Sequence, residues 1–144
     1  MKKLFLVALV FSLFSLNAFS QDRVITYDQL PKTSQDFITT HFNKANISYM
    51  KIDEETYGFE YEVYFNNGTK VEFDKSGALK KVDCGHSSVP AAIIPEKVKT
   101  YVSTNYPGVI ITEWCKKRTN WKAELSNGLD LYFDSMYQLI GIDD

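Results

Sequence analysis

Two stretches of this sequence occur twice, and the repetition constrains the fold more than any other feature. The segment from Leu30-Pro31 to His41-Phe42 matches the segment from Ile94-Pro95 to Asn105-Tyr106. In the same way, Asn67-Gly68 to Phe73-Asp74 matches Asn127-Gly128 to Phe133-Asp134. The period is about sixty residues, which is longer than a solenoid repeat and long enough for a small unit that completes its core against its twin. We therefore predict a tandem duplication.

The first twenty residues have the pattern of a secretory signal peptide. Met1-Lys2-Lys3 precedes an apolar stretch from Leu4 to Leu16, and Ala18-Phe19-Ser20 places small residues before a cut at Gln21. The stretch is too short to span a bilayer, and it contains no charged residue that would give it the polar face of a buried helix. We expect residues 1–20 to be removed and the protein to be periplasmic or secreted, with no membrane insertion after cleavage.

The charge of the chain argues against nucleic acid as a partner. The 16 basic and 18 acidic residues are interspersed, and loss of Lys2 and Lys3 would make the chain more acidic. No basic patch is present that could neutralise phosphates. Residues 21–144 are enough for one core, so we predict a single domain over this range.

A one-sided helix is expected after the proline of each copy, because proline is well tolerated in a first helical turn. The helical stripe falls in the first copy on Leu30, Ser34, Phe37 and Ile38, and in the second on Ile94, Val98, Tyr101 and Val102. Both helices should therefore cover one face of a sheet.

After each helix, the hydrophobic period changes to the alternation of half-buried antiparallel strands. The Asn-Gly pairs at Gly68 and Gly128 are typical of tight hairpin turns. The predicted strands are 47–52, 57–65, 69–74 and 78–83 in the first copy, and 109–115, 121–125, 129–133 and 138–142 in the second.

These elements predict an α+β fold, in which a helix plus four-stranded antiparallel unit is duplicated in tandem and the helices pack on one face of the sheet. Repeat one covers residues 28–84 and repeat two covers 93–144. The linker, 85–92, is short and holds Gly85, Ser87, Ser88 and Pro90. A short linker favours two copies that share one core.

The order of these motifs resembles the PepSY-like proteins of bacterial envelopes. The shared features are Leu/Ile-Pro, an amphipathic helix, an aromatic strand, Asn-Gly, and an apolar strand that ends in Phe-Asp. The resemblance covers residues 28–144 and implies the beta-lactamase-inhibitor-like fold. Gly77 in the final turn of the first copy is replaced by Tyr137 in the second. These are scaffold motifs, and the resemblance brings no catalytic residue with it.

The sequence offers little that predicts catalysis, a cofactor or a metal. Cys84 and His86 lie one residue apart from each other, with Cys115 as a third candidate ligand, but they lack the paired spacing of zinc sites. The carboxylates Asp74 and Asp134 end matching strands, where they are better explained as caps of turns than as an acid and base pair. No phosphate loop, nucleophile elbow or His-Glu-x-x-His motif is present. We therefore expect no enzyme.

Cys84 and Cys115 allow two interpretations. In an oxidising compartment they could form one disulfide. Alternatively, they are two separate buried thiols, because a disulfide requires α-carbons within about 7 Å, which the sequence does not show.

Alternation sends a set of polar side chains to the sheet face that the helices leave open. The candidate binding residues are Glu60, Glu62, Tyr64, Glu72, Lys122, Glu124 and Tyr132, with Lys70 and Asp130 beside them. Tyrosine is common at binding hot spots. The other interpretation is a solvated face held together by cross-strand charge pairs. Trp114 belongs either to this face or to the core.

We accordingly expect a non-enzymatic exported binding module that presents its open sheet face to a protein or peptide of the envelope, in the manner of an inhibitor. The alternative is a small-ligand carrier or envelope hydrolase with a pocket between helices and sheet. A deep, charged pocket would favour the alternative.

Overall fold

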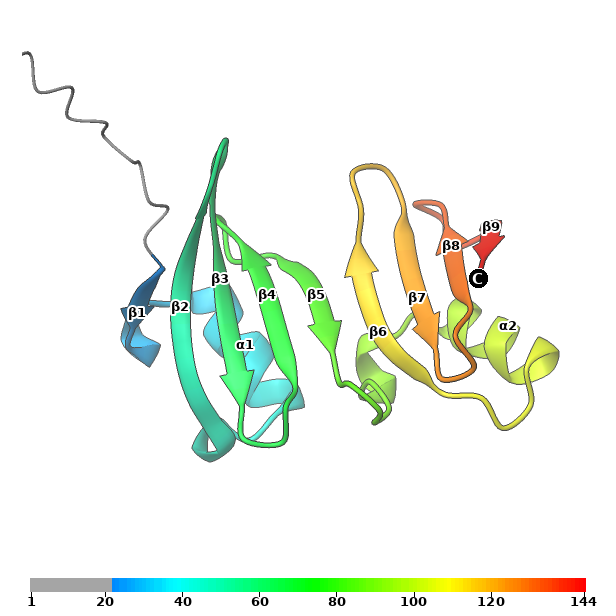
Figure 1. Ribbon diagram of the computed structural model, residues 1–144, viewed down its shortest axis with the longest axis horizontal. Helices are drawn as coiled ribbons and strands as arrows, with labels where there is room; N and C mark the ends of the chain where they lie inside the picture. Colours follow the sequence, from blue (N-terminus) through cyan, green and yellow to red (C-terminus); the bar gives the residue numbers. More distant parts are fainter. Residues whose placement is uncertain (1–21) are drawn as a thin grey trace, which may run out of the picture.

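The computed structural model describes residues 22–144, so the predicted signal peptide lies outside the described residues (Figure 1). The helices are α1 (Lys32–His41) and α2 (Glu96–Asn105), with short 3-10 turns at Tyr27–Gln29, Lys44–Asn46 and Ala91–Ile93. The strands are β1 (Arg23–Ile25), β2 (Ile47–Glu55), β3 (Gly58–Phe65), β4 (Lys70–Asp74), β5 (Leu79–Asp83), β6 (Ile111–Lys116), β7 (Trp121–Leu125), β8 (Asp130–Phe133) and β9 (Leu139–Asp143). After β1, each half thus consists of a helix followed by four strands, as the sequence predicts.

All nine strands form one antiparallel sheet, and their spatial order is their order in the chain. The two halves meet where β5 pairs with β6, with Val82 opposite Trp114. The linker follows this seam, because Val89 donates its N–H to the carbonyl of Ile111 at 2.8 Å. The sheet is therefore continuous across both halves.

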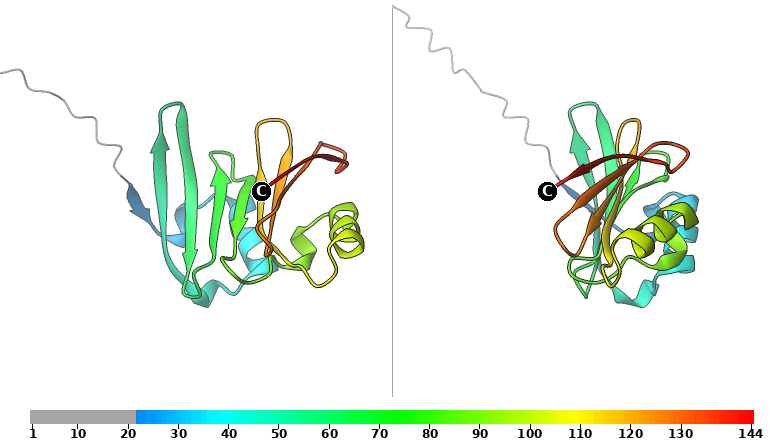
Figure 2. Two further views of the ribbon diagram at one scale, coloured as in Figure 1. Left: turned by 45° about the vertical axis from the view of Figure 1, so that its right-hand side comes forward. Right: turned by 90° about the vertical axis from the view of Figure 1, so that its right-hand side faces the viewer.

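Both helices lie on the same side of the sheet (Figure 2). The predicted helical stripes face the core: Ile38 and Val98 are fully buried, and Tyr101 packs partly buried against the same core. Ser34 is also buried, and its hydroxyl donates to the carbonyl of Gly77 at 3.0 Å. Pro31 and Pro95 precede the first helical residue instead of lying within the first turn.

Matching aspartates close matching turns. Asp74 accepts N–H groups of Ser76 and Ala78 through one carboxylate oxygen, at 2.8 and 3.1 Å. Asp134 accepts those of Met136 and Gln138 in the same way, at 2.8 and 2.9 Å. The capping role predicted for both residues is confirmed.

The sequence left the side of Trp114 open, and the structure places it in the core. Its indole is 2 % exposed and stacks on Trp121 with ring centroids 4.9 Å apart. Strand β1 was not predicted, and β2 runs three residues beyond the predicted strand 47–52. Among residues 22–144, no helix is both long and apolar enough to cross a membrane.

Candidate functional site

The candidate site is the side of the sheet opposite the helices, which we call the open face. Alternation along β3 sends Val63 and Phe65 to the core and sends Glu60, Glu62 and Tyr64 to the open face. Glu60 and Glu62 are buried, at 5 % and 3 % exposure, so at these two residues the face is not solvated as the other interpretation would have it. Lys51 of β2 and Lys70 of β4 contact Glu62 from its two sides, and Lys80 of β5 reaches across β4 to Glu60.

Glu62 is the centre of the first cluster, which contains Asp22, Lys51, Glu62, Tyr64, Lys70 and Glu72. Its carboxylate lies 3.0 Å from the Lys51 ammonium and 2.5 Å from that of Lys70. Lys51 also reaches Asp22 at 2.7 Å, and Lys70 reaches Glu72 at 2.7 Å. Both ammonium groups thus bridge two carboxylates.

Tyr64 connects this cluster to an exposed aromatic surface. Its hydroxyl donates to Glu62 at 2.8 Å. Its ring stacks on Tyr49, with centroids 4.3 Å apart and an interplanar angle of 10°. Tyr49 is 45 % exposed, so the pair presents a flat apolar surface beside buried charge.

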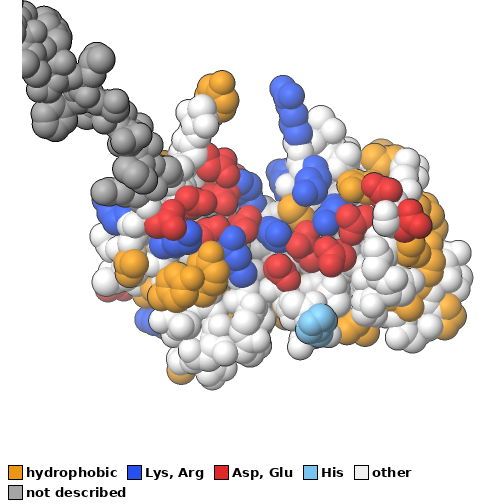
Figure 3. Space-filling view, in the orientation of Figure 1, with side chains coloured by type: hydrophobic (Ala, Val, Ile, Leu, Met, Phe, Trp, Pro, Cys, Tyr) orange, Lys and Arg blue, Asp and Glu red, His pale blue; other side chains and the backbone are white. Residues whose placement is uncertain are grey.

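Lys122 is the centre of the second cluster, which contains Lys81, Glu113, Lys122, Glu124 and Asp130. Its ammonium lies 3.2 Å from Glu113, 3.2 Å from Asp130 and 3.5 Å from Glu124. Lys81 pairs with the other oxygen of Glu113 at 3.0 Å. Lys81 lies directly opposite Glu72 of the first cluster in the ladder between β4 and β5. Acidic and basic side chains therefore lie side by side across both halves of the open face (Figure 3).

The local environment separates the pKa values of neighbouring carboxyl groups. Burial raises the pKa of Glu60 above its usual range, more than the ion pair with Lys80 lowers it. Burial acts in the same direction on Glu62, but hydrogen bonds from Lys70, Lys51 and Tyr64 together outweigh it and lower the pKa of Glu62. Burial and the bond to Glu62 raise the pKa of Tyr64 to about 12. The environment of Glu62 therefore favours its ionised form, whereas that of Glu60 favours its neutral form.

Three carboxylates of the open face converge. Asp53, Glu60 and Glu62 each offer one oxygen, and these oxygens lie within 4.8 Å of one another. Burial, a hydrogen bond with Asp22 and the charge of Glu62 raise the pKa of Asp53. Oxygen atoms in such a group are the ligands that calcium prefers. No catalytic arrangement follows from these groups, because Glu60 and Glu62 are held by lysines.

Two hairpins project beyond the charged network (Figure 3). The hairpin between β2 and β3 carries Tyr57, which is 99 % exposed. The hairpin between β6 and β7 carries Lys116, Lys117 and Arg118, all exposed. One projection is thus aromatic and the other is basic.

The structure unites most of the sequence-predicted site residues. Glu62, Tyr64 and Glu72 lie in the first cluster, and Lys122 and Glu124 in the second. Tyr132 shares the face but packs over Gly141, outside both clusters. Sequence reasoning missed Tyr49, Lys51, Asp53, Lys80, Lys81 and Glu113. The alternation of the predicted strands that contain Tyr49, Lys51, Lys81 and Glu113 could have found these four.

Cys84 and Cys115 are free thiols, both buried. Cys84 belongs to the core on the helix side, whereas Cys115 pairs with Lys81 and Lys122 in the ladders and faces the open side. Burial raises the pKa of both thiols. The structure therefore corresponds to the interpretation as separate thiols.

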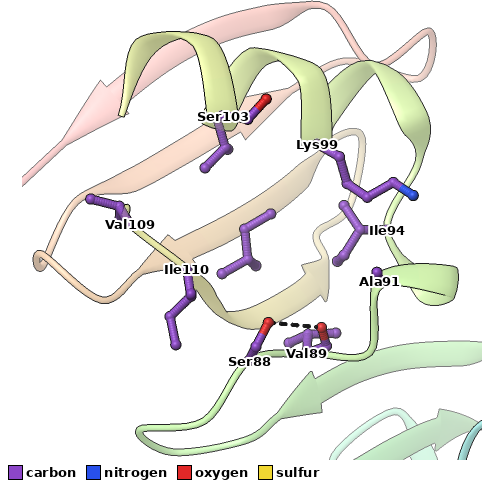
Figure 4. Close-up of a pocket in the computed structure, with 10 residues that line it drawn as sticks. Ser88, Val89, Ala91, Ile94, Lys99, Ser103, Val109 and Ile110 are labelled. Atoms are coloured by element: carbon purple, nitrogen blue, oxygen red, sulfur yellow. Dashed lines mark hydrogen bonds between the residues drawn. The ribbon is translucent and has the colours of Figure 1, made fainter. Parts of the chain in front are cut away.

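One apolar cavity lies between α2 and the start of β6 (Figure 4). It has a volume of about 180 Å³, and Val89, Ile94, Val109 and Ile110 contribute to its walls. Lys99 is the charged residue in its lining. Pockets for drug-sized ligands have about 300 to 1,000 Å³. This cavity is therefore smaller than a pocket for a drug-sized ligand.

Comparison with known proteins places this geometry in a family. The family described as "Putative beta-lactamase-inhibitor-like, PepSY-like" matches residues 59–141. No curated protein matches the sequence.

Several solved structures share the whole fold. A periplasmic protein of the DUF2874 family from Bacteroides vulgatus is 37% identical with a TM-score of 0.81, and the match covers 88% of this chain and 99% of that one. A "putative calcium-regulated periplasmic protein" from Bacteroides thetaiotaomicron is 41% identical with a TM-score of 0.82, covering 85% and 97%. A periplasmic protein of unknown function from Bacteroides vulgatus is 28% identical with a TM-score of 0.80, covering 86% and 100%.

Proposed function

Since the chain belongs to the PepSY-like, beta-lactamase-inhibitor-like family and is a periplasmic or secreted protein, we propose that it is a non-enzymatic binding protein whose open face contacts a protein or peptide partner. The observation that carries this proposal is the asymmetry of the sheet. Both helices pack on one side, and the other side carries an ordered charged network. The two similar halves are interpreted as products of a tandem duplication.

The open face has the properties of a preorganised interface. Its charged side chains are already paired and largely buried, so a partner would immobilise few of them on binding. The Tyr49–Tyr64 stack adds a rigid apolar area of the kind that is enriched at hot spots. The hairpins that carry the exposed residues Tyr57 and Arg118 project separately beyond the charged network (Figure 3). The small apolar cavity gives the carrier alternative less support.

Affinity capture from periplasmic extract, with the chain from Gln21 as bait, tests this proposal. The open-face variant combines Tyr49→Ala and Tyr132→Ala, which leave the buried ion pairs intact. The matched control combines Thr100→Ala and Thr104→Ala on the exposed side of α2. We expect the control to recover the same partner as the unchanged chain and the open-face variant to lose it. Equal recovery by both variants, at equal thermal stability, would contradict the proposal.

Calcium binding is a second candidate function, favoured by the convergence of Asp53, Glu60 and Glu62. One similar protein is described as calcium-regulated. A calcium ion would have to displace Lys51 from Glu62 and Lys80 from Glu60, because both carboxylates are paired. Calcium binding would then change the ion pairs of the first cluster.

Calorimetric titration with calcium chloride tests this second candidate. Asp53→Asn should abolish the heat of binding, whereas Glu124→Gln, on the same face but in the second cluster, should preserve it. Absence of any heat at millimolar calcium would exclude this function and leave the protein-binding proposal unaffected.

A further inference from the structure

The outer edge of β9 differs from the edge of its counterpart in the first half. Strand β5 pairs with β4, and β9 pairs with β8, with the same register break one position before the end of the ladder. Phe73 lies opposite Leu79 as Phe133 lies opposite Leu139. Ile142 therefore corresponds to Val82, and Asp143 corresponds to Asp83. Strand β5 is covered on its other side by β6, but β9 is the last strand of the sheet.

The two corresponding side chains differ sharply in exposure. Val82 is 0 % exposed because β6 sets Trp114 directly opposite it. Ile142 lies on the same helix side but is 51 % exposed. Ile140 and Met136 are also exposed nearby, and Figure 3 shows hydrophobic side chains gathered at this edge. Ile142 thus lacks the cover that the fold gives to its counterpart.

The backbone of this edge is suitable for a further strand. Beyond β5, Cys84 donates its N–H to the carbonyl of Thr112 at 2.9 Å, so alternate N–H groups of this segment point toward β6. By correspondence, the N–H of Ile142 points away from β8. Unpaired edge groups beside apolar side chains form a template for strand addition. The opposite edge, β1, is only three residues long and begins with Arg23.

We propose that β9 accepts an extended segment of a partner protein as a tenth, antiparallel strand. The pairing of β5 with β6 defines the register of this segment and its apolar residue, whereas its charge follows from Asp143, because β6 itself places Glu113 opposite Asp83. A large apolar residue lies opposite Ile142, as Trp114 lies opposite Val82. A lysine or arginine lies opposite Asp143, which stands next to Asp130 in the ladder and forms no salt bridge with any of residues 22–144.

A second copy of this chain fits the edge less well. Two-fold pairing of β9 about Gly141 would place Asp143 opposite Leu139 of the second copy, so its carboxylate would gain no cation. Pairing with β1 of a second copy would offer only three residues. A foreign segment can supply both the apolar residue and the cation.

A peptide with the sequence of β6 and its flanks tests the proposal. The probe carries residues 110–117 of this chain with Glu113→Lys and Cys115→Ser and a fluorescent label. We expect saturable binding by anisotropy and slower amide exchange at Ile142. Ile142→Lys should weaken binding by about tenfold or more, because it replaces the central apolar side chain of the proposed contact with a charged one. The matched control is Ile140→Lys, which is similarly exposed but lies at the register break.

Three results would overturn this proposal. The first is no saturable binding of the probe to the unchanged chain. The second is binding that Ile142→Lys and Ile140→Lys weaken equally, or exchange protection outside β9. The third is a dimer in sedimentation that Ile142→Lys dissociates, because that result would assign the edge to a second copy. Urea midpoints of both variants establish that each is folded.

Discussion

Tyr137 adopts a backbone φ of 60° at the position in the second half that Gly77 occupies with a φ of 87° in the first. Each donates its N–H to the carbonyl of the aspartate that opens the turn, at 3.0 Å to Asp134 and 2.8 Å to Asp74. Glycine and tyrosine thus form the same turn, although only glycine adopts this region without steric cost. Tyr137 compensates by packing against Trp114, with ring centroids 6.4 Å apart.

The requirement for glycine in the first turn is steric as well as conformational. A Cβ at Gly77 would lie 2.4 Å from the hydroxyl of Thr33 and 2.6 Å from Cβ of Pro31. We expect Gly77→Ala to lower the free energy of unfolding by about 2 to 4 kcal/mol, because it adds overpacking to backbone strain. Urea denaturation measures this change.

Gly128 provides the matched control for that prediction. It has a φ of 91°, but a Cβ there would meet no atom within 4 Å. Gly128→Ala should therefore cost only about 1 kcal/mol, from the backbone alone. Equal losses for the two variants would show that the approach of α1 to the turn is unimportant.

Stability at acid pH should depend on Glu62. Its folded pKa is below the ordinary value of 4.5, so its ionised form stabilises the fold above that pH. This contribution is lost as the pH falls through the folded pKa. Glu62→Gln should cost about 2 to 4 kcal/mol at pH 7, because Lys51 and Lys70 lose a buried partner. The difference from the unchanged chain should shrink below pH 4.5.

Glu60→Gln is the control of opposite sign. The folded pKa of Glu60 is raised, so its protonation favours the folded state as the pH falls. In Glu60→Gln, the free energy of unfolding should therefore fall more steeply as the pH is lowered. In Glu62→Gln, it should fall less steeply. Thermal melting between pH 3 and 7 distinguishes the two, and parallel curves would contradict the assigned environments.

The thiols should both be titratable once the protein is unfolded. Cys84 and Cys115 lie on opposite faces of the sheet and are free. We expect two reactive thiols in unreduced protein in urea, and slow reaction in the folded state, where burial raises both pKa values. A titre of zero in urea would show that a disulfide forms.

The sequence predicted the fold through features that are local. Alternation and the 3.6-residue period identified the helices and eight of the nine strands, and the Asn-Gly pair at Gly128 identified a hairpin. The sequence did not predict the burial of a side chain where that burial depends on residues from other strands. Glu60 and Glu62 face away from the helices as predicted, yet Lys80, Lys51 and Lys70 bury them. No pattern within a single strand contains that information.

The hydroxyl of Tyr64 should lower the pKa of Glu62 and stabilise the fold. It donates to Glu62, so its removal takes away one of the bonds that lower the pKa of that carboxyl. Tyr64→Phe should raise the pKa of Glu62 and cost about 0.5 to 1.5 kcal/mol of stability, the usual worth of one hydrogen bond. Carbon-detected NMR of the carboxyl and urea denaturation measure the two effects. Tyr132→Phe is the control, because the Tyr132 hydroxyl has no hydrogen-bond partner within residues 22–144 and should change neither. An unchanged Glu62 titration in Tyr64→Phe would show that the two lysines alone set its pKa.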